Sequence, residues 1–233
     1  MKANSSAPQP ASREHSGSQT AQRPDAEADR RPSEGSSSIA TVVGWAAVGF
    51  SVLYLLSDLL ELAQGGFSTP QLLMTYVAEA AIPLFVLGLY AVQRPRIGWP
   101  GLVSAVVYAY TFVYFTSTVV YALAERTSDW QSLEQRLGVW LTVHSVLMLL
   151  AGVGFGIAVI RAGVFPRWTG ATLIAGMLLM IITSGLPAPA QAASAGIRDL
   201  AFAAMGATLL ARRRRRIVAA DLPTNVRAET RSA

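Results

Sequence analysis

The chain has 233 residues, of which 52% are hydrophobic and only 14% are charged. Soluble domains usually carry about 25% charged residues, so this composition argues against that class and favours a membrane protein. The chain has no cysteine, which excludes disulfides, cysteine-ligated zinc and thiol nucleophiles.

Residues 1–38 are rich in Ser, Ala, Pro, Gln and charge, with almost no large apolar side chain. Such a segment cannot bury enough surface to offset its chain entropy, so we predict a disordered cytoplasmic tail. It is too long and too polar to begin a signal peptide, so we expect the first apolar segment to stay in the protein.

Six apolar segments follow, and each has about the 20 residues that a helix needs to cross a bilayer. In chain order they are 39–63, 71–92, 98–124, 137–160, 168–186 and 192–211. The last is the weakest, because it contains Arg198, Asp199 and many small residues. We predict an all-α polytopic membrane protein, with a six-helix transmembrane domain over 39–211 and a basic cytoplasmic tail over 212–233.

The connections between these segments differ in their arginine content. The connections 93–97 and 161–167 carry two arginines each, whereas 64–70 and 187–191 carry no charge. Positive charge gathers on the cytoplasmic side, so six spans place both tails inside, as expected for a bacterial cytoplasmic membrane. We expect the final run to lie among anionic lipid head groups rather than on nucleic acid; it comprises Arg212, Arg213, Arg214, Arg215 and Arg216.

Two shorter patterns predict local structure. Ser128 followed by Gln131 has capping-box spacing, which predicts a short outer helix from about Asp129. Gly152 and Gly156 form a GxxxG pattern, which indicates close helix packing either within the chain or between two copies in a homo-oligomer.

The connection between the fourth and fifth segments reads Arg-Ala-Gly-x-x-Pro-Arg-Trp-x-Gly, from Arg161 to Gly170. With Gly152 and Gly156 before it and Gly176 after it, this stretch resembles a family of small integral membrane proteins of unknown function from high-GC, actinobacterial-type bacteria. The resemblance implies a six-helix bundle and brings no catalytic residues with it.

Counting 1.5 Å per residue from the expected helix ends places every ionisable group of the spans in the outer half of the bilayer. These groups are Asp58, Glu61, Glu79, His144, Arg198 and Asp199. Charge at this depth is costly, so we expect the groups to face the bundle interior and pair. Arg198 and Asp199 project about 100° apart on their helix, so we expect Arg198 to pair with acids of the first two helices instead.

This cluster has two interpretations, a helix-packing network and a ligand or proton site. Glu79 is the strongest single candidate, because a buried carboxyl group can carry a proton. Pro83 removes the N–H that would bond the Glu79 carbonyl and predicts a kink. A tolerated membrane proline and a broken helix that opens a cavity both remain open.

Hydroxyl groups form a stripe along the third segment, which either binds helices together or forms one wall of a pocket. The stripe comprises Ser104, Thr111, Tyr114, Thr118 and Tyr121, of which we take Tyr114 and Thr118 as candidate ligand contacts. His144 is the one histidine in the spans, and zinc usually needs more nitrogen or sulfur ligands. We predict no metal and no cofactor.

The polar groups favour a binding or transport protein that takes a small solute, cation or proton into an outward-facing pocket. The alternatives are a membrane-embedded lipid hydrolase, with or without a metal, and a structural or regulatory membrane partner. Motifs of common enzymes, such as HExxH, a phosphate loop or a nucleophile elbow, are absent, which favours a non-enzyme.

Overall fold

The computed structural model describes residues 33–221. The chain divides into two units, Met1–Glu34 and Gly35–Ala233, and almost all described residues belong to the second, to which everything below refers. Of the predicted tails, residues 1–32 and 222–233 therefore lie outside the described residues.

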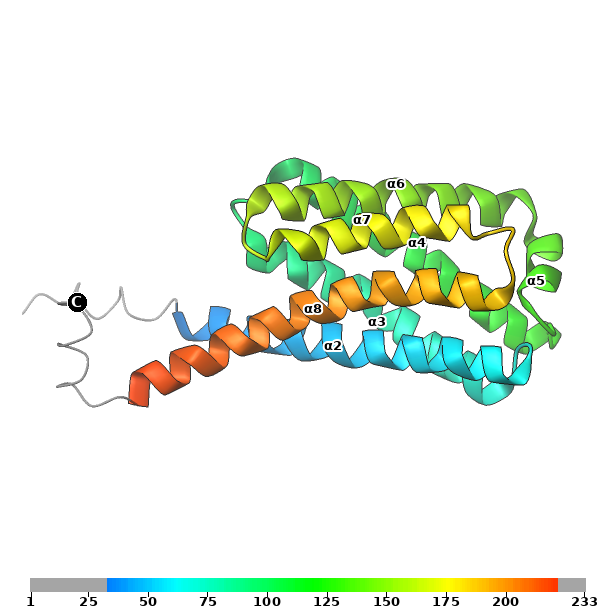
Figure 1. The fold of residues 1–233 in the computed structure, drawn as a ribbon, viewed down its shortest axis with the longest axis horizontal. Coiled ribbons are helices and arrows are strands. Elements are labelled where there is room, and N and C mark those ends of the chain that lie inside the picture. The colour runs from blue at the N-terminus through cyan, green and yellow to red at the C-terminus, as the bar shows by residue number, and fades with distance from the viewer. Residues whose placement is uncertain (1–32, 222–233) are drawn as a thin grey trace, which may run out of the picture. The chain divides into compact units, whose positions relative to one another are not determined.

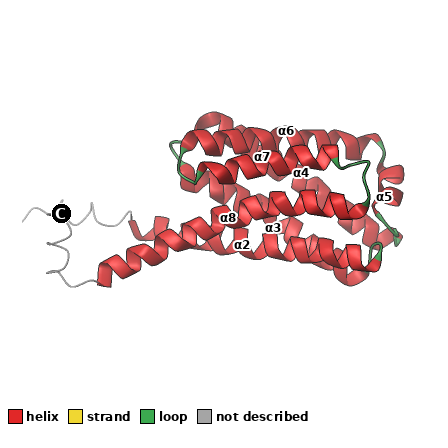
Figure 2. Ribbon diagram, in the orientation of Figure 1, coloured by secondary structure: helices red, strands yellow, loops and turns green. Residues whose placement is uncertain are grey.

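Seven helices joined by short loops make up the described residues, among which there is no strand (Figures 1 and 2). They are α2 (Ser33–Gln64), α3 (Thr69–Gln93), α4 (Gly98–Glu125), α5 (Trp130–Leu137), α6 (Val139–Ala162), α7 (Arg167–Ile182) and α8 (Ala188–Asp221). The predicted all-α class and the predicted short helix after Asp129 are confirmed. Residues 33–38, expected in the tail, form the first turns of α2, and the arginine run continues α8.

Four of these helices are long and apolar enough to cross a membrane: α2 from Ser38 onward, α3, α4 and α6. Helix α7 is apolar but has only 16 residues. Large apolar side chains stay exposed on all of these helices, as Val42, Leu84, Val113 and Leu150 illustrate. So much exposed apolar surface is typical of a lipid-facing protein rather than of a soluble one.

The turns fall at two opposite ends of the helices. Figure 1 shows the α2–α3 turn, α5 and the α7–α8 turn at one end, with the α6–α7 turn at the other. The α2–α3 turn uses Gly65 at φ +70°, a left-handed conformation that glycine adopts without strain. The backbone N–H of Phe67 then donates to the Ser128 carbonyl at 2.7 Å, which ties this turn to the loop before α5.

Helix α3 starts at a side-chain cap and runs past its internal proline. The Ser68 hydroxyl accepts from the Gln71 N–H, and Pro70 lies in the first turn, where a missing N–H costs nothing. The helix then continues through Pro83 to Gln93. The broken-helix alternative for Pro83 is therefore wrong, although the proline still leaves the Glu79 carbonyl without its usual partner.

An aromatic cluster joins α3, α4 and α8 in the core. The ring of Phe202 lies 5.5 Å from that of Phe85 and 5.8 Å from that of Tyr108. All three side chains are at most 2% exposed. The charged residues of α8 therefore lie one turn from a fully packed region, which limits how far they can move.

Glycines let α6, α7 and α8 approach closely. A Cβ on Gly156 would lie 2.9 Å from the Gly170 carbonyl, so the GxxxG pattern serves packing of α6 on α7 within the chain. A Cβ on Gly176 would lie 2.6 Å from the backbone nitrogen of Arg198. Gly176 therefore sets the distance between α7 and the segment of α8 that carries Arg198.

We expect Gly176→Ala to lower stability by about 1–3 kcal/mol, because the new methyl group meets backbone that cannot move aside. Gly49→Ala is the matched control, since a Cβ there meets nothing within 4 Å. Thermal unfolding of the purified proteins in detergent compares the two. Equal melting temperatures would contradict the close approach of α7 and α8.

Candidate functional site: an acidic cavity at the α5 end

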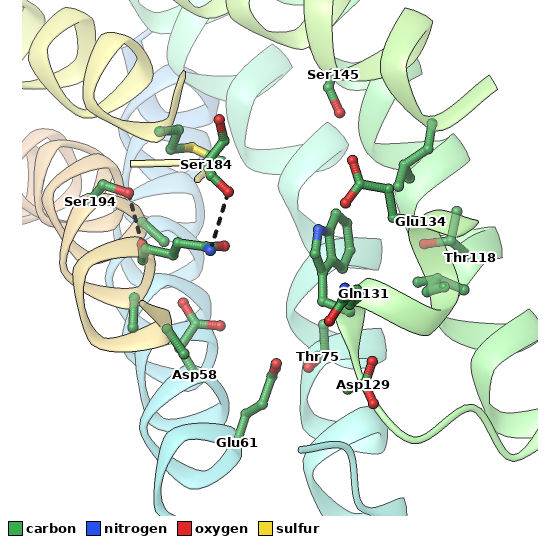
Figure 3. A pocket seen from close by; sticks show the side chains of 18 of the residues that line it. Asp58, Glu61, Thr75, Thr118, Asp129, Gln131, Glu134, Ser145, Ser184 and Ser194 are labelled. Carbon is green, nitrogen blue, oxygen red and sulfur yellow. Dashed lines mark hydrogen bonds between the residues drawn. The ribbon is translucent and has the colours of Figure 1, made fainter. Parts of the chain in front are cut away.

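A cavity of about 940 Å³ opens at the end of the helices where α5 lies. All seven described helices contribute residues to its lining. Figure 3 shows Asp58 and Glu61 of α2 on one side of the opening, with Asp129, Gln131 and Glu134 on the other. The cavity therefore gathers residues that lie far apart in the sequence.

Glu79 lies deep in this cavity, with only 4% of its surface exposed. The Tyr54 hydroxyl donates to Glu79 Oε1 at 2.9 Å. Glu79 Oε2 has no hydrogen-bond partner among the described residues. A buried carboxyl oxygen without a partner is costly, which is typical of a group that a ligand or proton completes.

Arg198 forms an ion pair with its own neighbour. Its Nε donates to Asp199 Oδ1 at 2.9 Å, and its Nη2 lies at the same distance from that oxygen. The expectation that Arg198 pairs with acids of the first two helices instead of Asp199 is wrong, because the long arginine side chain reaches the neighbouring carboxylate despite the angle between the two residues. The guanidinium also lies 4.8 Å from the Tyr54 ring centroid, within cation–π range.

The charges around Arg198 do not balance. Arg198 and Asp199 are 2% and 4% exposed and neutralise each other. Asp58 and Glu79 remain as two further carboxyl groups that line the same cavity. Since charge is expensive in a poorly hydrated interior, this surplus favours uptake of a proton or a cation.

A hydroxyl and amide network links α2 to α3 nearer the opening. The Ser57 hydroxyl donates to the Gln71 carbonyl at 3.1 Å and lies 2.5 Å from Thr75 Oγ1. Gln71 Nε2 in turn donates to Glu61 Oε2 at 3.0 Å. These bonds hold Glu61 at the cavity edge, which makes it a fixed acidic group rather than a free one.

Helix α5 forms the outer edge of the cavity, and Asp129 caps it. The Asp129 carboxylate accepts from the Ser132 N–H at 2.8 Å and from the Ser128 hydroxyl at 2.7 Å. These hydrogen bonds hold the pKa of Asp129 below its ordinary value, so the cap stays charged at neutral pH. The cap is therefore Asp129, and the capping role predicted for Ser128 is corrected.

His144 does not join the cavity. Its ring stacks on Tyr114 at a centroid distance of 3.6 Å, and Nε2 lies 3.3 Å from the Tyr110 hydroxyl. Nδ1 lies 2.8 Å from the Trp140 carbonyl, to which it donates a hydrogen bond. His144 therefore packs at the α4–α6 interface, away from the acids that it was expected to meet.

The hydroxyl stripe of α4 divides between two environments. Thr118 lines the cavity, with its hydroxyl bonded to the Phe115 carbonyl. Tyr114 lies with His144, and Thr111 bonds the Tyr108 carbonyl within its own helix. Of the stripe, only Thr118 remains a candidate ligand contact in this cavity.

Sequence reasoning missed several residues of the cavity. Trp130 and Glu134 were not among the candidates, yet they line the cavity. Met177 and Met180 of α7 also line the cavity, with no sequence signal beyond apolarity. Among the described residues, no group of three or more His, Cys, Asp or Glu side chains gathers as a metal site requires.

Comparisons with protein-family models, with curated proteins and with solved structures gave no match for this chain.

We predict opposite effects from neutralising Arg198 and Glu79. Arg198→Gln leaves the buried carboxyl groups uncompensated and should cost about 3–5 kcal/mol. Glu79→Gln keeps an acceptor for Tyr54 and removes surplus charge, so its stability should match or exceed that of the unmodified protein. Thermal unfolding in detergent at neutral pH measures the stability of both variants. If Glu79→Gln unfolds at a lower temperature than the unmodified protein, the charge of Glu79 holds the bundle together.

Proposed function

We propose that this chain is a six-span membrane protein of the bacterial cytoplasmic membrane whose acidic cavity binds a small positively charged solute, or a proton, from the outer side. The observation that carries the proposal is Glu79, a buried carboxyl group that faces the cavity with one unpartnered oxygen. The proposal includes transport as well as simple binding, because in both cases the solute first binds at an outward-facing site.

Helices α7 and α8 supply the fifth and sixth spans of this proposal. The charges of Arg198 and Asp199 are paired and buried inside the helices, so they do not face lipid. Helix α8 has 34 residues, which exceeds the ~20 that a span requires. Helix α7 is short, and the turn at Thr183 and Ser184 extends it toward the cavity end.

The arginine distribution supports the orientation. Arg94 and Arg96 follow α3, Arg161 ends α6, and Arg212 lies beyond the apolar part of α8. All of these positions lie away from the cavity end, where the α2–α3 and α7–α8 turns carry no charge. The positive-inside tendency then places both tails in the cytoplasm and the cavity opening outside.

Interfacial contacts fit the same arrangement. Trp99 and Trp168 are exposed at the starts of α4 and α7, and Trp140 is exposed at the opposite end on α6. Exposed tryptophans at both ends suit the two membrane interfaces. Arg212 to Arg216 would contact anionic lipid head groups on the cytoplasmic side. The resemblance of the α6–α7 turn to small six-helix bacterial membrane proteins agrees with this proposal.

The hydrolase alternative has no observation in its favour, because His144, its expected acid–base or metal group, lies outside the cavity. If the protein has a structural or regulatory role instead, the cavity binds no ligand. The binding experiments below distinguish that outcome from ligand binding.

Single-cysteine labelling tests the orientation directly, because the chain has no native cysteine to remove. We expect a membrane-impermeant maleimide to label Ser184→Cys and Ser145→Cys in intact cells, since both residues line the cavity. Arg96→Cys should react only after permeabilisation, and His144→Cys should stay protected by its buried position. Labelling of Arg96→Cys in intact cells would overturn the proposal.

A further inference from the structure

The lining of the cavity combines charged and apolar side chains. Its Asp, Glu, Lys and Arg residues are five acids, Asp58, Glu61, Glu79, Asp129 and Glu134, against one base, Arg198. The guanidinium of Arg198 is already paired with Asp199. A positively charged ligand is therefore attracted to this cavity and an anion is repelled.

Two acids of the lining carry oxygens without hydrogen-bond partners. Glu79 Oε2 and Asp58 Oδ2 are buried atoms without hydrogen-bond partners among the described residues. Both residues line the cavity, and Glu79 is 4% exposed. These oxygens accept hydrogen bonds or positive charge from a ligand at no cost in existing bonds.

The part of the lining that α6 and α7 supply is apolar and adaptable. It is built from Met148 and Leu149 of α6 together with Met177, Met180 and Ile181 of α7. Methionine side chains are flexible and polarisable, so they adjust to apolar ligands of different shape. A small inorganic cation would leave this wall without a partner.

The volume and the mouth of the cavity favour an organic ligand. About 940 Å³ lies at the upper end of the range for small-molecule sites and far exceeds one ion. No metal-type cluster gathers in the part of the chain that the structure describes. Trp130 lines the opening and is 39% exposed, and an indole face attracts organic cations.

We propose that the ligand is a hydrophobic organic cation whose positive group lies at Asp58 and Glu79 and whose apolar body packs against the methionine wall of α6 and α7. This inference rests on the proposed function, since it names the chemical class that the same cavity takes. It follows from the juxtaposition of unpartnered acids and an adaptable apolar wall in one space.

Three probe ions distinguish the contribution of ligand charge to binding from the contribution of apolar surface. Tetraphenylphosphonium is a hydrophobic cation, tetraphenylborate is an anion of nearly the same shape, and tetramethylammonium is a cation with little apolar surface. Equilibrium dialysis measures the binding of each ion to the purified full-length protein in detergent. Protein-free micelles correct for the ion that the detergent takes up. We expect saturable binding of tetraphenylphosphonium, at least about tenfold tighter than binding of either other ion.

Substitutions locate the bound ion. Asp58→Asn and Glu79→Gln should each weaken tetraphenylphosphonium binding about tenfold, because each removes an open carboxylate. Glu125→Gln is the matched control: it also changes an acid to an amide at the same end of the helices, but Glu125 is exposed and outside the lining. Its binding should stay unchanged, and size-exclusion profiles establish that each variant is folded.

Each contrary result has a distinct meaning. Tetramethylammonium binding as tightly as tetraphenylphosphonium would overturn the hydrophobic class while leaving the proposed cation site in place. Tetraphenylborate binding equally tightly would overturn both. Binding of tetraphenylphosphonium that persists in folded Asp58→Asn and Glu79→Gln would place the ion elsewhere and overturn the inference.

Discussion

The buried ion pair of Arg198 and Asp199 is the constraint on which the rest of the structure depends. A guanidinium inside a bundle of apolar helices is tolerated only where a counter-charge and a polarisable surface meet it. Asp199 supplies the charge and the Tyr54 ring supplies the surface. Because Tyr54 also donates to Glu79, one side chain connects the ion pair of α8 with the buried acid of α3.

This arrangement explains why a cavity lies beside a well-packed core. Toward the arginine-rich end, glycines bring backbones together, as where a Cβ on Gly206 would lie 2.6 Å from the Gly44 carbonyl. Toward the α5 end, the acids of α2 and α3 line the cavity beside the hydrogen-bond network that joins these two helices. The fold thus combines a closely packed half with a half in which Asp58 and Glu79 line a cavity.

The positions of these helices could be predicted from the sequence, because long apolar runs and charged turns are local properties. The expected boundaries at 98–124 and 71–92 differ little from those of α4 and α3. The positions of the acids along their helices could also be predicted, since they need only the rise per residue, whereas their depth in the bilayer stays a prediction. The direction of a side chain around a helix could not, because it depends on which neighbour each face meets. His144 therefore turned out to face Tyr114, and Arg198 turned out to bend back onto Asp199, where a simple angular argument excluded it.

A double-mutant cycle between Arg198 and Glu79 tests the central claim most directly, namely that one guanidinium restrains a surplus of buried negative charge. The free energies of unfolding of Arg198→Gln, Glu79→Gln and the double variant are compared in one detergent. The account predicts that Glu79→Gln recovers part of the stability lost in Arg198→Gln, with a coupling of roughly 1–3 kcal/mol. Additive effects would show that the two side chains do not share one electrostatic balance and would contradict the account.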